Sequence, residues 1–82
     1  MGLIEDGSVK AEEIRRIREG LDMDRNELAS LLCLSGYQAM MNIETGFRKP
    51  SKLAIRLLRH LNSLPPTKAR ALIKDLLSHE PI

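Results

Sequence analysis

The sequence has few aromatic side chains, a single cysteine and no long apolar run. Aromatic residues make up 2% of the 82 residues, so the core must be aliphatic, a composition that suits helices better than sheets. The lone Cys33 excludes an internal disulfide and a zinc site built from cysteine alone. Without about 20 consecutive apolar residues, no transmembrane helix is expected. The N-terminus carries acids and no hydrophobic signal core, so we expect a cytoplasmic protein.

The usual residue sets of a catalytic or metal site are also missing from the sequence. No Ser–His–Asp set, glycine-rich phosphate loop or spaced pair of carboxylates stands out. His60 and His79 are far apart in sequence, and neither stands beside a cluster of acids or thiols. We therefore expect that the protein is not an enzyme and binds no metal or cofactor.

Charge is absent from one stretch: no charged residue lies between Glu27 and Glu44, although 29% of all residues are charged. Residues 1–27 hold eight acids and five bases, whereas residues 44–60 hold one acid and five bases. The positive part of the chain therefore follows directly after the uncharged stretch. A basic patch of this kind favours a polyanionic partner, although many basic helix faces are only solvated.

Capping residues predict where the first two helices begin and end. After a flexible N-terminal arm over residues 1–7, Ser8 is expected to cap the first helix and Gly20 to end it. Asp24 and Glu27 have the spacing of a capping box, which predicts a second helix that ends near the turn "CLS".

Three more helices follow, and no stretch alternates long enough to predict a strand. Ser35 and Gln38 have the spacing of another capping box, and Gly46 is expected to stop the helix that it opens. Ser51 introduces the next helix, and the "LPP" segment separates it from the last one. These three helices are predicted over residues 36–45, 51–62 and 66–78.

Only three or four residues join the second and third predicted helices, a spacing typical of a helix-turn-helix. The segments "RNELASLL", "NIETGFRKPS" and "LLRHL" resemble the Cro/phage-repressor (XRE-type) helix-turn-helix DNA-binding family. The resemblance covers residues 11–62. It implies an all-α, five-helix, lambda-repressor-like domain with the helix-turn-helix at the second and third helices. Residues 8–63 would then be the DNA-binding domain, and residues 64–82 a C-terminal helix that serves in dimerisation.

The turn departs from the family pattern in two ways. Cys33 stands where the family usually carries glycine. The segment between Leu32 and Ile43 is one residue longer than in the commonest version of the family. In this longer form the chain is similar to the C-terminal DNA-binding domain of MqsA-like antitoxins. The resemblance thus implies a phage, mobile-element or antitoxin setting.

Four residues of the uncharged stretch are predicted to contact DNA bases. Amide side chains can pair bidentately with adenine, and Gln38 and Asn42 lie one turn apart on one helix face. Met41 can pack against a thymine methyl, and the resemblance places Tyr37 at a base-facing position. Each has a plainer alternative: Gln38 as a cap partner, Asn42 as a solvated amide, Tyr37 as a packing residue and Met41 as a cover for apolar surface.

Cations are expected at the rim of this face, because charge attracts any phosphate while neutral donors and acceptors distinguish bases. The resemblance places Arg25 at a phosphate-contacting position, and Arg48 and Lys49 in a loop that flanks the DNA backbone. The alternative is that these are ordinary solvated charges. The predicted phosphate contacts are Arg25, Ser35, Arg48, Lys49 and Lys52. The resemblance also implies an internal salt bridge between Arg18 and Glu44.

The last predicted helix carries an apolar stripe that is large for the final element of so small a chain: Leu72, Ile73, Leu76 and Leu77. One short helix in the groove contacts few base pairs, so we expect a homodimer that pairs through this stripe. The alternative is that the stripe packs only on its own domain.

The resulting hypothesis is a sequence-specific double-stranded DNA-binding transcriptional regulator. It would act as a dimeric repressor on an inverted-repeat operator, often that of its own operon. The alternative hypothesis is a protein-interaction module, or an antitoxin whose main role is to bind a toxin or another protein partner.

Overall fold

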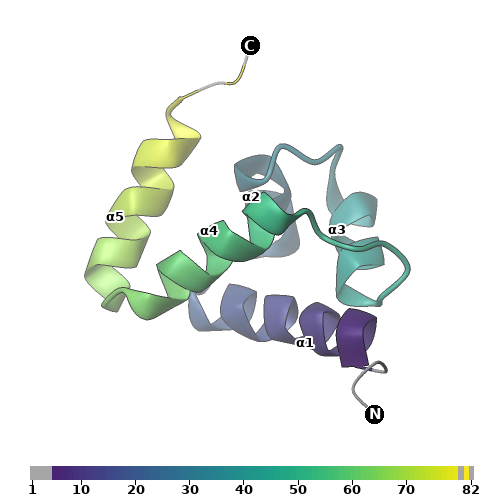
Figure 1. Ribbon diagram of the computed structural model, residues 1–82. Helices are drawn as coiled ribbons and strands as arrows, with labels where there is room; N and C mark the ends of the chain where they lie inside the picture. The colour runs from purple at the N-terminus through teal and green to yellow at the C-terminus, as the bar shows by residue number, and fades with distance from the viewer. Residues whose placement is uncertain (1–4, 80, 82) are drawn as a thin grey trace.

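The computed structural model describes residues 5–79 and 81, and this part of the chain forms five helices and no strand. The helices are α1 (Glu5–Gly20), α2 (Arg25–Leu31), α3 (Tyr37–Glu44), α4 (Lys52–Ser63) and α5 (Pro66–Leu77). The predicted all-α class and the number of helices are confirmed. Helix α1 lies along the base of the molecule, with α2 and α4 above it, α5 at one end and α3 at the other (Figure 1).

Helix α1 begins four residues earlier than predicted. It starts at Glu5, not after Ser8, so residues 5–7, which were assigned to the N-terminal arm, are helical. The rest of the predicted arm, residues 1–4, lies outside the described residues.

Side-chain caps open α2 and α4 as predicted. Oδ1 of Asp24 accepts a hydrogen bond from the Glu27 amide at 2.8 Å, and the Ser51 hydroxyl accepts one from the Ala54 amide at 3.0 Å. Each bond satisfies one of the backbone donors that a helix N-terminus leaves without a partner.

The predicted capping box at the start of α3 is wrong. The N-cap is Gly36, which makes no side-chain cap, and Ser35 is an exposed residue one position too early. Gly36 has φ 151° and ψ −162°, a backbone conformation in which a residue with a side chain would be strained. The backbone conformation of this glycine therefore sets where the helix begins. Gln38 bonds to Asn42 instead of to the cap.

A Schellman motif ends α2, and Cys33 is its left-handed residue. The Leu34 amide donates to the Ala29 carbonyl at 2.8 Å and the Cys33 amide to the Ser30 carbonyl at 3.2 Å. Cys33 has φ 59°, the left-handed conformation in which glycine is favoured. Cysteine therefore adopts a backbone conformation here that glycine would adopt at a lower cost.

The ends of α1 and α3 differ in how they use glycine. Gly46 follows α3 with φ 88° and donates its amide to the Ile43 carbonyl, as the predicted stop should. Gly20 is the last helical residue of α1, but the left-handed residue after that helix is Asp22, with φ 59°. A short polar side chain tolerates this conformation better than a branched one.

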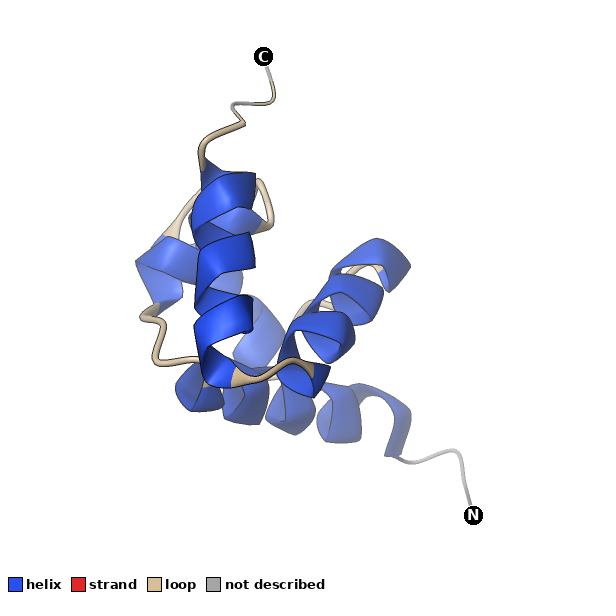
Figure 2. Cartoon of the chain, turned by 90° about the vertical axis from the view of Figure 1, so that its left-hand side faces the viewer, coloured by secondary structure: helices blue, strands red, loops and turns tan. Residues whose placement is uncertain are grey.

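All five helices contribute to one core. Its buried residues are Ile14, Ile17, Met23, Leu28, Ala29, Met40, Ile43, Leu58, Leu61 and Ile73. Helix α5 packs against α2 and α4, so the C-terminal segment shares this core with the rest of the chain (Figure 2).

Ile73, one of the four residues predicted for the dimer interface, is 1% exposed and belongs to the core of its own chain.

Candidate functional site

The outward face of α3 carries the four side chains that were predicted to contact bases. Tyr37 and Gln38 are exposed, and Met41 and Asn42 are half-buried at its edge. The opposite face is buried against the core and consists of Ala39, Met40, Ile43 and Glu44. Helix α3 packs on α2 and α1, so its inner face fixes how the outer face is presented. The outward face carries no formal charge.

The two amides on this face are bonded to each other. Nε2 of Gln38 donates to Oδ1 of Asn42 at 3.1 Å. This bond leaves the carbonyl oxygen of Gln38 as an acceptor and the amide nitrogen of Asn42 as a donor. The bond orients the two amides relative to each other, and both still have donors and acceptors to offer a ligand.

A basic loop follows α3. Arg48 and Lys49 of this loop and Lys52, the first residue of α4, are exposed, and none of them forms an ion pair with another residue in the described part of the chain. Six of the seven other arginines are matched by acids in the described residues, and Arg56 of α4 is the exception. Arg59 binds Glu13 through two bonds of 2.7 and 2.8 Å. The loop is therefore a place where positive charge is left for an external anion.

A buried ion cluster holds α3 to α1 and α2. Glu44, whose side chain is 2% exposed, accepts from Nε of Arg18 at 2.6 Å and from Nη2 of Arg18 at 3.2 Å. Arg18 also donates to the Met23 carbonyl at 3.0 Å. The pairing of Arg18 with Glu44 that the resemblance implied is therefore present.

Arg25 joins the same cluster, which the sequence did not predict. Its Nε donates to Oε1 of Glu44 at 3.0 Å, and its Nη1 donates to the hydroxyl oxygen of Tyr37 at 3.2 Å. Its Cζ lies 5.7 Å from the centre of the Tyr37 ring. The hydrogen bond to Glu44, more than any other contact, raises the pKa of Arg25 above its ordinary value. Arg25 is therefore charged at every practical pH and is oriented before any ligand binds.

Phe47 is an exposed side chain beside the basic loop, and the sequence did not predict a role for it. It lies between α3 and α4 and is 85% exposed, more than either Tyr37 or Leu53, the other large hydrophobic side chains exposed in the described residues. Only its position within "TGFRKPS", next to two cations, could have marked it as part of this surface.

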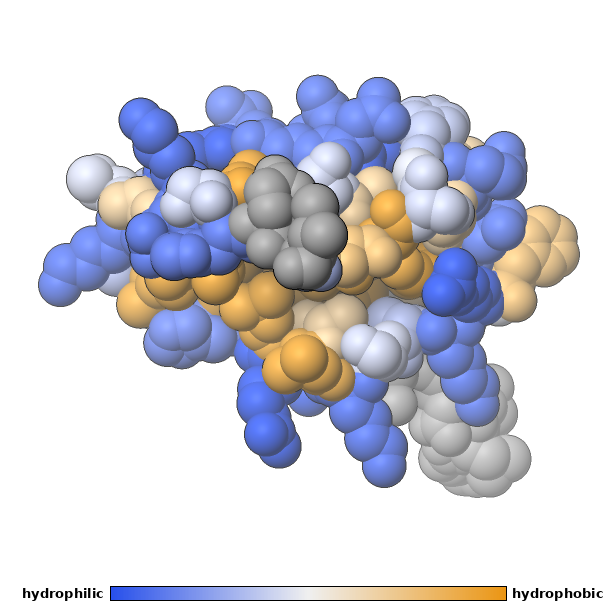
Figure 3. Space-filling model, turned by 90° about the horizontal axis from the view of Figure 1, so that it is seen from above, coloured by the Kyte–Doolittle hydropathy of each residue, from blue (hydrophilic) through white to orange (hydrophobic). Residues whose placement is uncertain are grey.

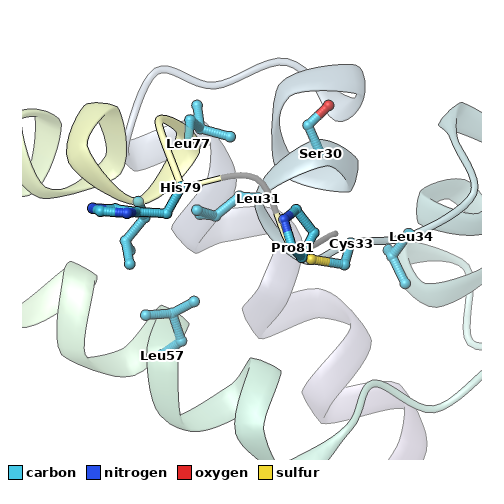
Figure 4. A pocket seen from close by; sticks show the side chains of 9 residues that line it. Ser30, Leu31, Cys33, Leu34, Leu57, Leu77, His79 and Pro81 are labelled. Atoms are coloured by element: carbon cyan, nitrogen blue, oxygen red, sulfur yellow. The ribbon is translucent and has the colours of Figure 1, made fainter.

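An apolar hollow lies between the end of α2, α4 and α5, away from these polar groups. Its volume is about 330 Å³, and leucines provide most of its walls (Figure 4). The residues that line it are Ser30, Leu31, Cys33, Leu34, Leu57, Leu76, Leu77, His79 and Pro81. A smaller hollow of about 140 Å³ shares Leu31, Cys33 and Leu57 with it and reaches Leu53.

Seen from above, apolar residues gather in the middle of the molecule and hydrophilic ones surround them (Figure 3). Of the four leucines and isoleucines assigned to a dimer seam, Leu76 and Leu77 line the larger hollow and Leu72 is half-buried beside the core.

No protein family matches the sequence, and neither the curated proteins nor the solved structures provide a match. None of the helices is both long and apolar enough to cross a membrane, among the residues described. In the same part of the chain, no three His, Cys, Asp or Glu side chains come together as they would around a metal ion.

Proposed function

We propose that the chain is a sequence-specific double-stranded DNA-binding transcriptional regulator, which represses by occupying an inverted-repeat operator as a dimer. In this proposal α2 and α3 form the helix-turn-helix of a lambda-repressor-like domain, and α3 enters the major groove. A phage, mobile-element or antitoxin operon, located in the cytoplasm, is the setting that the family resemblance implies.

The outward face of α3 is the observation that carries the proposal. It presents uncharged donors and acceptors from Gln38 and Asn42, while unpaired cations lie in the loop directly after the helix. Neutral amides can distinguish base edges in the major groove, and cations bind the phosphates on either side. A face that is open, uncharged in the middle and basic at its rim meets both requirements.

Selection of bound duplexes from random DNA tests this function directly. We expect recovery of a common sequence with two-fold symmetry. On that selected duplex, Gln38→Ala should weaken binding by about 1–3 kcal/mol, with little effect on a scrambled duplex. Arg48→Ala should weaken binding to both duplexes alike and reduce the slope of log affinity against log salt by about 1. Fluorescence anisotropy titrations at several salt concentrations measure both effects.

Arg16→Ala is the matched control, because Arg16 is an exposed arginine of α1 outside both the proposed DNA interface and the proposed dimer interface. It should leave both affinities and the salt slope unchanged. Recovery of no common sequence, together with a salt slope near zero, would contradict the proposed function.

The proposed homodimer uses the half-buried leucines of α5 and the apolar hollow beside them. At micromolar concentration the wild-type protein should sediment as a dimer. Leu76→Lys places a charge in this apolar surface and should shift the protein to monomer, because a buried unpaired charge is costly. Phe47→Lys changes an exposed side chain near α3 and should leave the dimer intact. A wild-type monomer both free and on DNA would rule the dimer out.

The apolar hollow also favours a second candidate, a module that binds a toxin or another protein. Soluble monomers rarely leave large apolar surfaces uncovered. Salt dependence separates the two candidates, since DNA binding through several phosphates weakens steeply with salt and an apolar protein contact does not.

A further inference from the structure

Arg25 and Tyr37 join the start of α2 to the start of α3 at the edge of the proposed DNA-binding face. The guanidinium of Arg25 is held at two points, by Glu44 Oε1 at 3.0 Å and by Tyr37 Oη at 3.2 Å. We propose that Arg25 and Tyr37 bind a single DNA phosphate together, so that Tyr37 holds the backbone and does not read a base. This inference rests on the proposed function and replaces the base-contacting role predicted for Tyr37.

The hydrogen-bonding capacity of Tyr37 argues against base reading. A tyrosine hydroxyl accepts through its oxygen and donates one hydrogen. Its oxygen already accepts from Arg25, and no described residue offers an acceptor for its hydrogen. The hydroxyl therefore has only its hydrogen left to donate to a base. Every base pair offers an acceptor for such a hydrogen in the major groove. A lone donor cannot tell one sequence from another.

The cation beside Tyr37 argues for a phosphate. Arg18 makes two hydrogen bonds to Glu44 and also lies 3.8 Å from Glu19. Arg25 therefore shares the carboxylate of Glu44 with Arg18, and its own side chain remains 28% exposed and open to an external anion. Its Nη2 forms no hydrogen bond with the described residues.

The geometry suits an anionic oxygen. Nη1 of Arg25 and Oη of Tyr37 are 3.2 Å apart, so one phosphate group can accept from the guanidinium and the hydroxyl at once. Tyr37 is 47% exposed, so its hydroxyl is accessible from outside, while the ring contact and Glu44 keep the two donors together.

Tyr37→Phe tests the inference because it keeps the ring and removes only the hydroxyl. We expect an about tenfold loss of affinity, equal on the selected and the scrambled duplex, as for a charged hydrogen bond to phosphate. Arg25→Ala should weaken both duplexes and reduce the salt slope by about 1. The double variant should bind about as well as Arg25→Ala alone, because without Arg25 the hydroxyl is no longer positioned on the phosphate.

Gln38→Ala is the comparison variant, since its loss should be confined to the selected duplex. Thermal unfolding of each variant shows whether an affinity change reflects lost folding. A Tyr37→Phe loss confined to the selected duplex, or losses that simply multiply in the double variant, would overturn this inference while the proposed function stands. Absence of duplex binding by the wild-type protein would remove the proposed function and this inference with it.

Discussion

Replacing Glu44 with glutamine should lower the free energy of unfolding by about 3–5 kcal/mol, because it removes the carboxylate that both arginines of a buried ion cluster share. The carboxylate accepts three hydrogen bonds, from Nε and Nη2 of Arg18 and from Nε of Arg25. A glutamine amide carries no charge, and its NH₂ group would face a guanidinium donor. Arg18 is buried, so its charge would remain without the compensation that the carboxylate supplies. Urea unfolding followed by circular dichroism measures the change.

Glu12→Gln is the matched control for Glu44→Gln. Glu12 lies on the exposed side of α1, 3.9 Å from Arg15 and 3.6 Å from Arg16, and its side chain is 53% exposed. Exposed pairs of this kind contribute about 0–0.5 kcal/mol, so the same substitution should change stability very little. Similar losses for the two variants would mean that the Glu44 cluster does not stabilise the fold.

Leu58→Ala should cost about 2–5 kcal/mol of stability, because Leu58 is fully buried among the residues of the common core. Removal of its side chain beyond Cβ leaves a cavity under α4, which packs against both α1 and α5. The same urea titration should show a lower midpoint with an unchanged slope, provided that unfolding remains two-state.

Leu53→Ala provides the comparison within the same helix. Leu53 is 72% exposed, so the identical substitution should change stability by no more than about 0.5 kcal/mol. If Leu53→Ala proved as destabilising as Leu58→Ala, the orientation of α4 in the structure would be wrong.

The helices were predictable because their start and stop signals act over three or four residues. Asp24 and Ser51 cap helices through an amide three positions later, and Gly46 ends α3 through its own backbone conformation. Ser35 failed as a cap because Gly36 adopts a conformation that moves the helix start by one residue. A backbone angle of that kind leaves no mark in the spacing of polar residues.

The outward face of α3 was predictable for a related reason. The periodicity of an α-helix places residues one turn apart on the same side, so Gln38 and Asn42 had to share a face. Burial of Met40 and Ile43 decides that this face points away from the core. The bond between the two amides depends on their rotamers, which spacing does not determine.

The partners of the arginines could not be predicted from the sequence. Arg70 donates to the Leu21 and Asp22 carbonyls and to Glu27, which ties α5 to the turn after α1. Such partners are more than forty residues apart in the chain. Because many acids and bases are available, composition alone could not say which of them would meet.

The sequence by itself thus determined the five helices, most of their ends and the uncharged face of α3, since each depends on residues within one or two helical turns. Only the tertiary structure decided that Ile73 belongs to the core, that Arg25 is held between Glu44 and Tyr37, and that leucines from three helices surround a hollow. These features depend on how whole helices pack against one another, and that packing is set by the combined fit of side chains distant in the chain.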